Sequence, residues 1–136
     1  MIPEDCYYTE SHVWIKPEED DVQLLGVTEP LLESLGQLLS LSLLDEDDPI
    51  MPSIPFGNVE GYQGTQQLYL PMEADIIEVN EELVANLEKL QSDPYGEGWL
   101  LRITLEDPQK ELIQLMTVHS YRDYVIEDLG DEYVNE

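Results

Sequence analysis

The sequence predicts a mainly β fold with small helices, and three observations support this. The apolar segments are short, and glycine, proline or acidic clusters interrupt them, a pattern typical of many short strands. Apolar and polar side chains alternate in residues 37–43 and again in residues 99–105, as in strands with two unlike faces. Residues 57–71 have the pattern of a β-hairpin with a glycine on each side of its turn.

The first part of the chain is predicted to hold a strand pair and a short helix. Residues 13–17 and 22–27 form the strands, and the acidic segment 18–21 forms the turn between them. Thr28 is a suitable N-cap for the helix that follows. Gly36 is placed to end that helix.

A further strand and the hairpin occupy the centre of the chain. Residues 37–43 are predicted to place three leucines on one face: Leu39, Leu41 and Leu43. The hairpin has one strand at Val59, a turn at Gly61–Gly64, and a second strand from Gln66 to Pro71. Glycine in the turn is expected to supply positive φ angles. Pro71 ends the second strand because proline cannot donate to a ladder.

The next segment is predicted to be a strand and a helix. Residues 74–79 form the strand, and Asn80 caps the helix that follows. The buried side of this helix is expected to consist of Val84, Leu87 and Leu90.

The end of the chain is predicted to be helical. Asp107 is the N-cap of a helix whose inner face consists of Leu112, Leu115 and Met116. A further short helix lies within residues 117–127. We therefore expect one domain, residues 1–127, and a frayed acidic tail, residues 128–136. A chain of 136 residues, of which 42% are hydrophobic, is large enough for one domain with a core.

The charge restricts the partners. The formal net charge is −26, from 31 acidic and 5 basic side chains. Nucleic acid and anionic membrane surfaces are excluded as partners, because both are bound through clusters of Lys and Arg. A basic protein surface is the partner that this charge favours. The alternative is an acidic surface that serves solvation, as in a protein from a salt-rich cell.

The expected cellular location and the absence of a predicted catalytic or metal site follow from motifs that the sequence lacks. The N-terminus has no basic and apolar signal pattern, and no apolar run of about 20 residues is present, so a cytoplasmic location is expected. His12 and His119 are the two histidines, and neither lies in a nucleophile motif. With the single cysteine Cys6, they do not form a recognisable metal set. We therefore predict no enzymatic activity and no metal site.

Five ordered segments of this sequence resemble the glycine-cleavage H-protein family. They are Tyr8–Trp14; Gly26–Thr28 with Leu35–Gly36; Gly57–Glu60; Leu68–Tyr69 with Pro71 and Glu78–Asn80; and Asp93–Leu100. The resemblance implies a lipoyl-domain-like β-sandwich or barrel hybrid with peripheral and C-terminal helices. It also implies that the hairpin is the part that presents a lipoyl group.

The resemblance fails at the residue that would carry the cofactor. In this family a lysine at the hairpin tip holds lipoate through an amide bond, and Gln63 occupies the matching position. A glutamine amide nitrogen is not a nucleophile, so we expect no lipoate. Gln67 and Val13 are neutral where the family usually has acidic residues, whereas Glu60 is retained.

The resemblance also indicates the residues of a site. The hairpin and its recognition elements would be Glu60, Gly61, Tyr62, Gly64 and Gln67. Ser11 and His12 would line the groove in which the arm rests. The alternative for His12 is a hydrogen-bonded residue at the end of a strand.

Three functions remain open at this stage. The first is a non-lipoylated module that binds a lipoate-handling enzyme or a glycine-cleavage-type subunit. The second is a true carrier in glycine decarboxylation, which Gln63 opposes. The third is a small-ligand-binding protein that uses the empty arm groove near Ser11, His12 and Tyr62.

Overall fold

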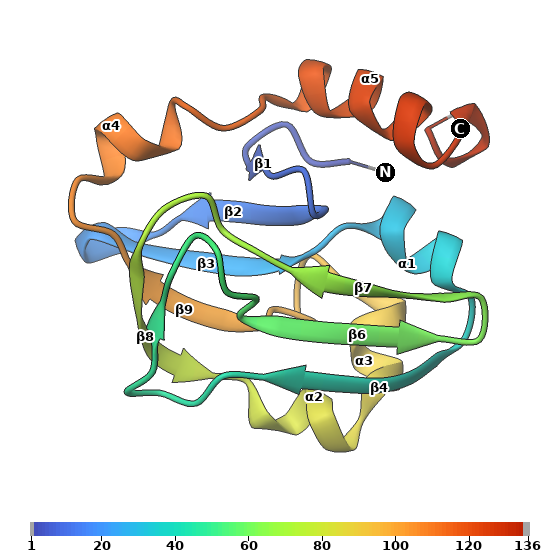
Figure 1. Ribbon diagram of the computed structural model, residues 1–136, viewed down its shortest axis with the longest axis horizontal. Helices are drawn as coiled ribbons and strands as arrows, with labels where there is room; N and C mark the ends of the chain where they lie inside the picture. Colours follow the sequence, from blue (N-terminus) through green and yellow to red (C-terminus); the bar gives the residue numbers. More distant parts are fainter. Residues whose placement is uncertain (1, 135–136) are drawn as a thin grey trace.

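The computed structural model describes residues 2–134, and over this range it contains two antiparallel sheets with small helices around them (Figure 1). The six-stranded sheet has the order β1 (Tyr7–Tyr8), β2 (Val13–Pro17), β3 (Val22–Val27), β9 (Leu101–Thr104), β8 (Ala74–Val79) and β5 (Pro49–Ile50). The three-stranded sheet has the order β4 (Leu38–Leu43), β6 (Gly57–Gly61) and β7 (Gly64–Leu68). The predicted mainly β fold with small helices is confirmed.

The main core is built from the inner faces of both sheets. Alternate residues of β2, β3 and β9 contribute to it, as expected where two sheets face each other. Its fully buried members include Val13, Ile15, Leu25, Val27, Val59, Leu68, Leu101 and Ile103. The predicted pairing of residues 13–17 with 22–27 is confirmed, from Val13 opposite Val27 to Pro17 opposite Gln23.

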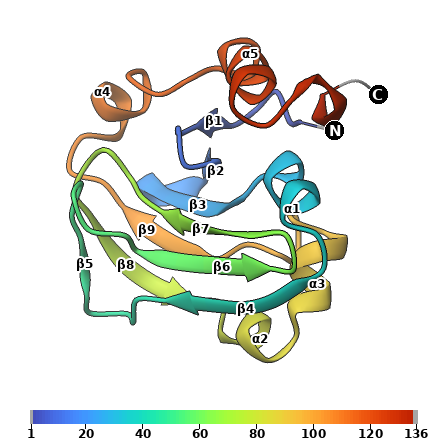
Figure 2. The same ribbon diagram turned by 45° about the vertical axis from the view of Figure 1, so that its right-hand side comes forward.

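A second, smaller core lies under helix α5 (Val118–Asp128). This helix covers β1 and β2 on the outer side of the six-stranded sheet, and Figure 2 shows α4 (Pro108–Leu112) on the same side. The ring of Tyr8 stacks on that of Tyr121, with centroids 4.5 Å apart. The cluster consists of Ile2, Cys6, Tyr8, Trp14, Leu24, Val118, Tyr121 and Val125.

Strand β4 differs from the prediction. A bulge between Leu38 and Ser40 shifts the register against β6. As a result Leu38 and Leu41 are buried, whereas Leu39 is 45% exposed. Leu43 is half-buried and packs against the core on the same side as Leu41, so the prediction that Leu39, Leu41 and Leu43 share one face was wrong only for Leu39. An extra residue in one strand reverses the alternation beyond it.

The helix after β8 is also different. It is split at Asn86 into α2 (Glu81–Ala85) and α3 (Leu87–Ser92), which lie on the side of the sheets opposite α5 (Figure 1). Leu83 and Leu90 are fully buried, Leu87 is half-buried and Val84 is exposed, so the predicted stripe is only partly correct. Asn80 precedes α2, but its side chain makes no capping bond and donates instead to the carbonyls of Glu97 and Trp99.

The two C-terminal helices agree better with the sequence. Asp107 caps α4 as predicted, because its carboxylate accepts from the backbone N–H of Lys110. The helix ends at Leu112, so Leu115 and Met116 lie beyond it, and Met116 forms a β-bridge with Tyr8.

The tail was predicted to be frayed from residue 128. Asp128 is instead the last residue of α5, and a 3-10 turn, η2, follows at Asp131–Tyr133. Residues 135–136 of the predicted tail lie outside the described residues. No helix within residues 2–134 has both the length and the apolar character needed to cross a membrane.

Candidate functional site

The hairpin places Tyr62 and Gln63 at its tip. Strands β6 and β7 pair from Gly57 opposite Leu68 to Gly61 opposite Gly64, which leaves a two-residue turn. Both turn side chains are exposed. The predicted position of Gln63 at an exposed hairpin tip is confirmed.

The glycines beside the turn have a different role from the predicted one. Among the described glycines, only Gly36 and Gly130 have positive φ, so the expected positive φ at Gly61 and Gly64 was wrong. Gly61 is required by a close approach: a Cβ at this position would lie 2.3 Å from the carbonyl oxygen of Leu35. The end of helix α1 (Glu29–Leu35) therefore packs directly on the hairpin backbone.

Hydrogen bonds fix the backbone of the tip. Tyr62 donates its N–H to the carbonyl of Gln37 at 3.0 Å, and Gln63 donates its N–H to that of Leu35 at 2.9 Å. The Gln91 amide of α3 holds the same segment, since it donates to the Gly36 carbonyl and accepts from the Leu38 N–H. The turn is thus attached to two neighbouring elements.

The side chains of the hairpin are mostly neutral. Gln63 extends along Gly36, where a Cβ would meet its Cγ at 3.3 Å. Glu60 is exposed and accepts a hydrogen bond from the Ser40 hydroxyl at 3.1 Å. Gln67 accepts one from the Tyr69 hydroxyl at 2.9 Å. Glu60 is the one acidic residue in the three strands of this sheet, in a chain with 31 of them.

Ser11 lies at a different place, where the β1–β2 loop meets the chain after β7. Its hydroxyl donates to the carbonyl of Tyr69 at 3.0 Å, and the Tyr69 N–H lies 3.1 Å from the same oxygen. Ser11 borders a cavity of about 540 Å³. The cavity is lined by Tyr8, Thr9, Glu10, Ser11, Pro52, Gln66, Tyr69, Leu70, Pro71, Gln114, Leu115, Met116 and Tyr124.

His12 does not border this cavity, and neither does Tyr62. The His12 side chain is fully buried, and its backbone has the left-handed φ of 67°. Its Nδ1 lies 2.8 Å from the Tyr121 hydroxyl and its Nε2 lies 2.7 Å from a carboxylate oxygen of Asp128. The structure thus supports the alternative interpretation, a hydrogen-bonded residue at a strand end. Of the three residues expected around the groove, it brings only Ser11 to the cavity.

The His12 contacts form a chain that continues to the start of α1. The Thr28 hydroxyl lies 2.6 Å from that of Tyr121, so Thr28 bonds to α5 in place of capping its own helix. Burial lowers the pKa of His12, and the hydrogen bond and charge of Asp128 oppose that shift. A neutral imidazole that donates from Nε2 to Asp128 and accepts at Nδ1 from Tyr121 satisfies every group.

Tyr121 and Asp128 were not among the site residues predicted from the sequence. They are seven residues apart on one helix, a spacing that places both side chains on the same face. That signal was available, but the assignment of residue 128 to a tail concealed it. No cluster of metal-ligating side chains occurs within residues 2–134. Burial raises the pKa of the Cys6 thiol to about 12, so this thiol stays protonated.

Together, the paired antiparallel sheets and the protruding hairpin define a lipoyl-domain-like protein. The solved structure of a glycine cleavage system H protein from Mycobacterium marinum matches this fold with a TM-score of 0.77. That match has 28% sequence identity and covers 90% of this chain and 97% of the other.

The sequence comparisons point to the same family. Residues 6–128 match the family model of the glycine cleavage H-protein. The glycine cleavage system H protein of Gloeobacter violaceus is 37% identical over 123 residues, which cover 90% of this chain and 95% of the relative. That of Halothermothrix orenii is 36% identical over 126 residues, which cover 93% and 97%. The chain therefore belongs to the glycine cleavage H-protein family, whose members are lipoyl carrier proteins and not enzymes.

Proposed function

We propose that this chain is an H-protein-like module that carries no lipoate and acts by binding another protein. The observation that carries the proposal is Gln63, which lies exposed at the hairpin tip where the family resemblance implies a lysine. The partner would be a lipoate-handling enzyme or a glycine-cleavage-type subunit, the kind of protein that receives an H protein.

The chemistry of the side chain opposes modification. The nitrogen lone pair of the Gln63 amide is delocalised into its carbonyl, so it does not attack an activated lipoyl group. The chain has three lysines, Lys16 in β2, Lys89 in α3 and Lys110 in α4, and none is in a hairpin turn. Lys16 and Lys89 also lie within ion-pair distance of Asp5 and Glu82.

The charge supports binding to a basic surface. With a net charge of −26, association with a basic partner would be accelerated at low salt and weakened as salt rises. Affinity that does not change with salt would count against electrostatic docking and would favour the alternative, an acidic surface that serves only solvation.

The direct test is the intact mass of the protein purified from its own host. We expect the mass of the unmodified chain. A lipoyl-sized increment on any lysine would contradict the proposal and support the carrier function. An H protein with the usual lysine, produced in the same host, is the control that shows whether the host attaches lipoate.

A second candidate function is small-ligand binding in the cavity at Ser11. The cavity of about 540 Å³ supports it, because this volume is in the range of small-molecule sites and its lining combines apolar and hydrogen-bonding groups. Titration with lipoamide, monitored by the NMR chemical shifts of the lining residues, tests this function independently of any protein partner. The cytoplasmic location stays a prediction.

A further inference from the structure

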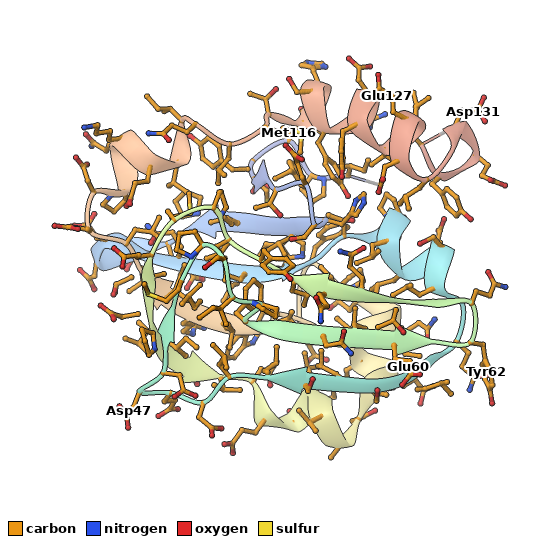
Figure 3. All side chains as sticks on the ribbon, viewed as in Figure 1. Asp47, Glu60, Tyr62, Met116, Glu127 and Asp131 are labelled. Atoms are coloured by element: carbon orange, nitrogen blue, oxygen red, sulfur yellow. The ribbon has the colours of Figure 1, made fainter. Side chains whose placement is uncertain are left out.

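The hairpin tip presents an aromatic side chain to solvent. Tyr62 is 71% exposed, and its hydroxyl has no hydrogen-bond partner among the described residues. Figure 3 shows Tyr62 at the outer end of the hairpin, directed away from the two sheets. Gln63 lies against Gly36, so the two turn residues differ in how they are presented.

The backbone that carries Tyr62 is held in place before any partner binds. The N–H groups of Tyr62 and Gln63 are bonded to the carbonyls of Gln37 and Leu35, and the Gln91 side chain of α3 is bonded to the same segment, at Gly36 and Leu38. A group on a fixed backbone loses less conformational entropy on association than one on a mobile loop. The tip is therefore preorganised for binding.

The surroundings of Tyr62 have the composition of an interface. The β4 bulge leaves Leu39 45% exposed, and its neighbours Leu38 and Ser40 pair with Gly61 and Glu60 at the end of the hairpin. The segments 33–39 and 60–64, which meet at the tip, contain two acidic residues and no Lys or Arg. A partly apolar surface beside the exposed carboxylate of Glu60 is therefore available to a partner.

We infer that the hairpin tip is a rigid docking element with Tyr62 as its anchor. Its partner is a protein that offers an apolar pocket for the phenol ring, bordered by Lys or Arg side chains that face Glu60. Exposed tyrosines on a fixed scaffold are among the residues that carry most of the affinity in interfaces. This inference rests on the proposed binding function and specifies its contact surface.

The test measures the Kd of the purified chain for lipoate ligase and for each glycine-cleavage subunit of the same host. We expect Tyr62→Ala to weaken the binding at least tenfold, whereas Tyr62→Phe retains most of it. Ile113→Ala is the matched control, because Ile113 is 73% exposed and lies just after α4, outside the hairpin. It should change the Kd less than twofold.

A second variant tests the role of the fixed backbone. Gln91→Ala removes the amide that bonds to Gly36 and Leu38 but leaves Tyr62 intact. We expect a loss of affinity of two- to fivefold, together with faster amide hydrogen exchange in residues 60–64. Faster exchange with unchanged affinity would show that preorganisation makes no contribution to binding.

The outcomes separate the two levels of the proposal. If the ligase or a subunit binds and Tyr62→Ala changes its Kd less than twofold, the docking element is wrong while the binding function stands. If neither the ligase nor any subunit binds the native chain, the proposed function is contradicted and this inference with it.

Discussion

The hairpin tip and the region around His12 both lie in segments that resemble the H-protein family, but their side chains have different surroundings. Both ring nitrogens of His12 are bonded within the protein, and the side chain is inaccessible to solvent. At the tip only backbone groups are bonded internally, whereas Tyr62 and Gln63 face solvent. Residues of the first kind hold the fold together, and residues of the second kind can change without affecting it.

Under the proposed function, this difference accounts for a chain that keeps the family fold with Gln63 at its hairpin tip. Replacing a buried side chain that makes two hydrogen bonds leaves its polar partners unsatisfied, which is among the most destabilising changes known for single residues. Replacing an exposed turn side chain usually has little effect on stability. The free energy of unfolding of variants at the two regions therefore measures this contrast.

The largest effect is expected at His12. We predict that His12→Ala lowers the free energy of unfolding by about 3 kcal/mol, because it removes two hydrogen bonds and leaves a void beneath α5. Chemical denaturation monitored by circular dichroism measures this. His119→Ala is the control, since His119 is exposed on α5, and its replacement should change the free energy of unfolding by less than about 0.5 kcal/mol. Equal effects of the two variants would contradict the structural role of His12.

The His12 contacts also show where sequence reasoning stops. The β2–β3 pair was predictable because its alternation and its turn are contiguous in the sequence. The bond from His12 to Asp128 joins residues separated by 116 positions, and no local pattern reports such a contact. His12 lies in a segment that resembles the H-protein family, and this resemblance placed it at a groove. Packing against α5 determines where the side chain actually lies.

The hairpin gives a second example. Its strands and turn followed from the glycines and Pro71, and the position of Gln63 at the tip followed from the family resemblance, but the reason for Gly61 did not. Positive φ and close approach both require glycine, and only the position of α1 shows which applies. The bulge in β4 escaped prediction because adjacent leucines, Leu38 and Leu39, allow either register.

Gly61 should show the second-largest effect. A Cβ at Gly61 would overlap the Leu35 carbonyl, so Gly61→Ala must displace either α1 or the hairpin, and we expect a loss of about 2 kcal/mol. Gly64→Ala is the matched control on the opposite strand, where a Cβ would only touch the Leu35 side chain at 3.5 Å. Thermal unfolding of both variants measures the difference. If Gly64→Ala were destabilised and Gly61→Ala were as stable as the native chain, the close approach to α1 would lie at Gly64 and not at Gly61.

The pH dependence of stability should show a smaller effect. Burial lowers the pKa of His12 from its ordinary value of 6.5, so the unfolded chain binds a proton that the folded chain does not. Its contribution is complete above pH 6.5 and is lost progressively as the pH falls towards the lowered pKa. We expect the free energy of unfolding to fall between pH 6.5 and 5.5, because over this interval protons bind the unfolded chain more than the folded one.

Denaturant unfolding at several pH values, with His12→Asn as the comparison, measures this loss. Asparagine tolerates the left-handed φ at this position and does not titrate. Asp128 is the carboxylate that contacts the ring, and the pKa values of Tyr121 and Tyr124 are raised, so these tyrosines stay neutral in this range. If the free energy of unfolding changed equally with pH in the native chain and in His12→Asn over this interval, the titrating group would not be His12.

The smallest effect on stability, less than about 0.5 kcal/mol, is expected for Gln63→Lys, because the backbone hydrogen bond of residue 63 to Leu35 does not depend on the side chain.

Gln63→Lys also supplies the primary amine that lipoylation needs. If the hairpin is arranged as in other H proteins, a lipoate ligase should modify this variant slowly. Adding Gln67→Asp restores a charge that the family usually has and should accelerate the reaction. Mass spectrometry after incubation with ligase, lipoate and ATP measures both rates against an H protein with the usual lysine. A double variant that stays unmodified while that control reacts completely would show that Gln63 does not occupy the acceptor position, and the proposed loss of the carrier function would fail with it.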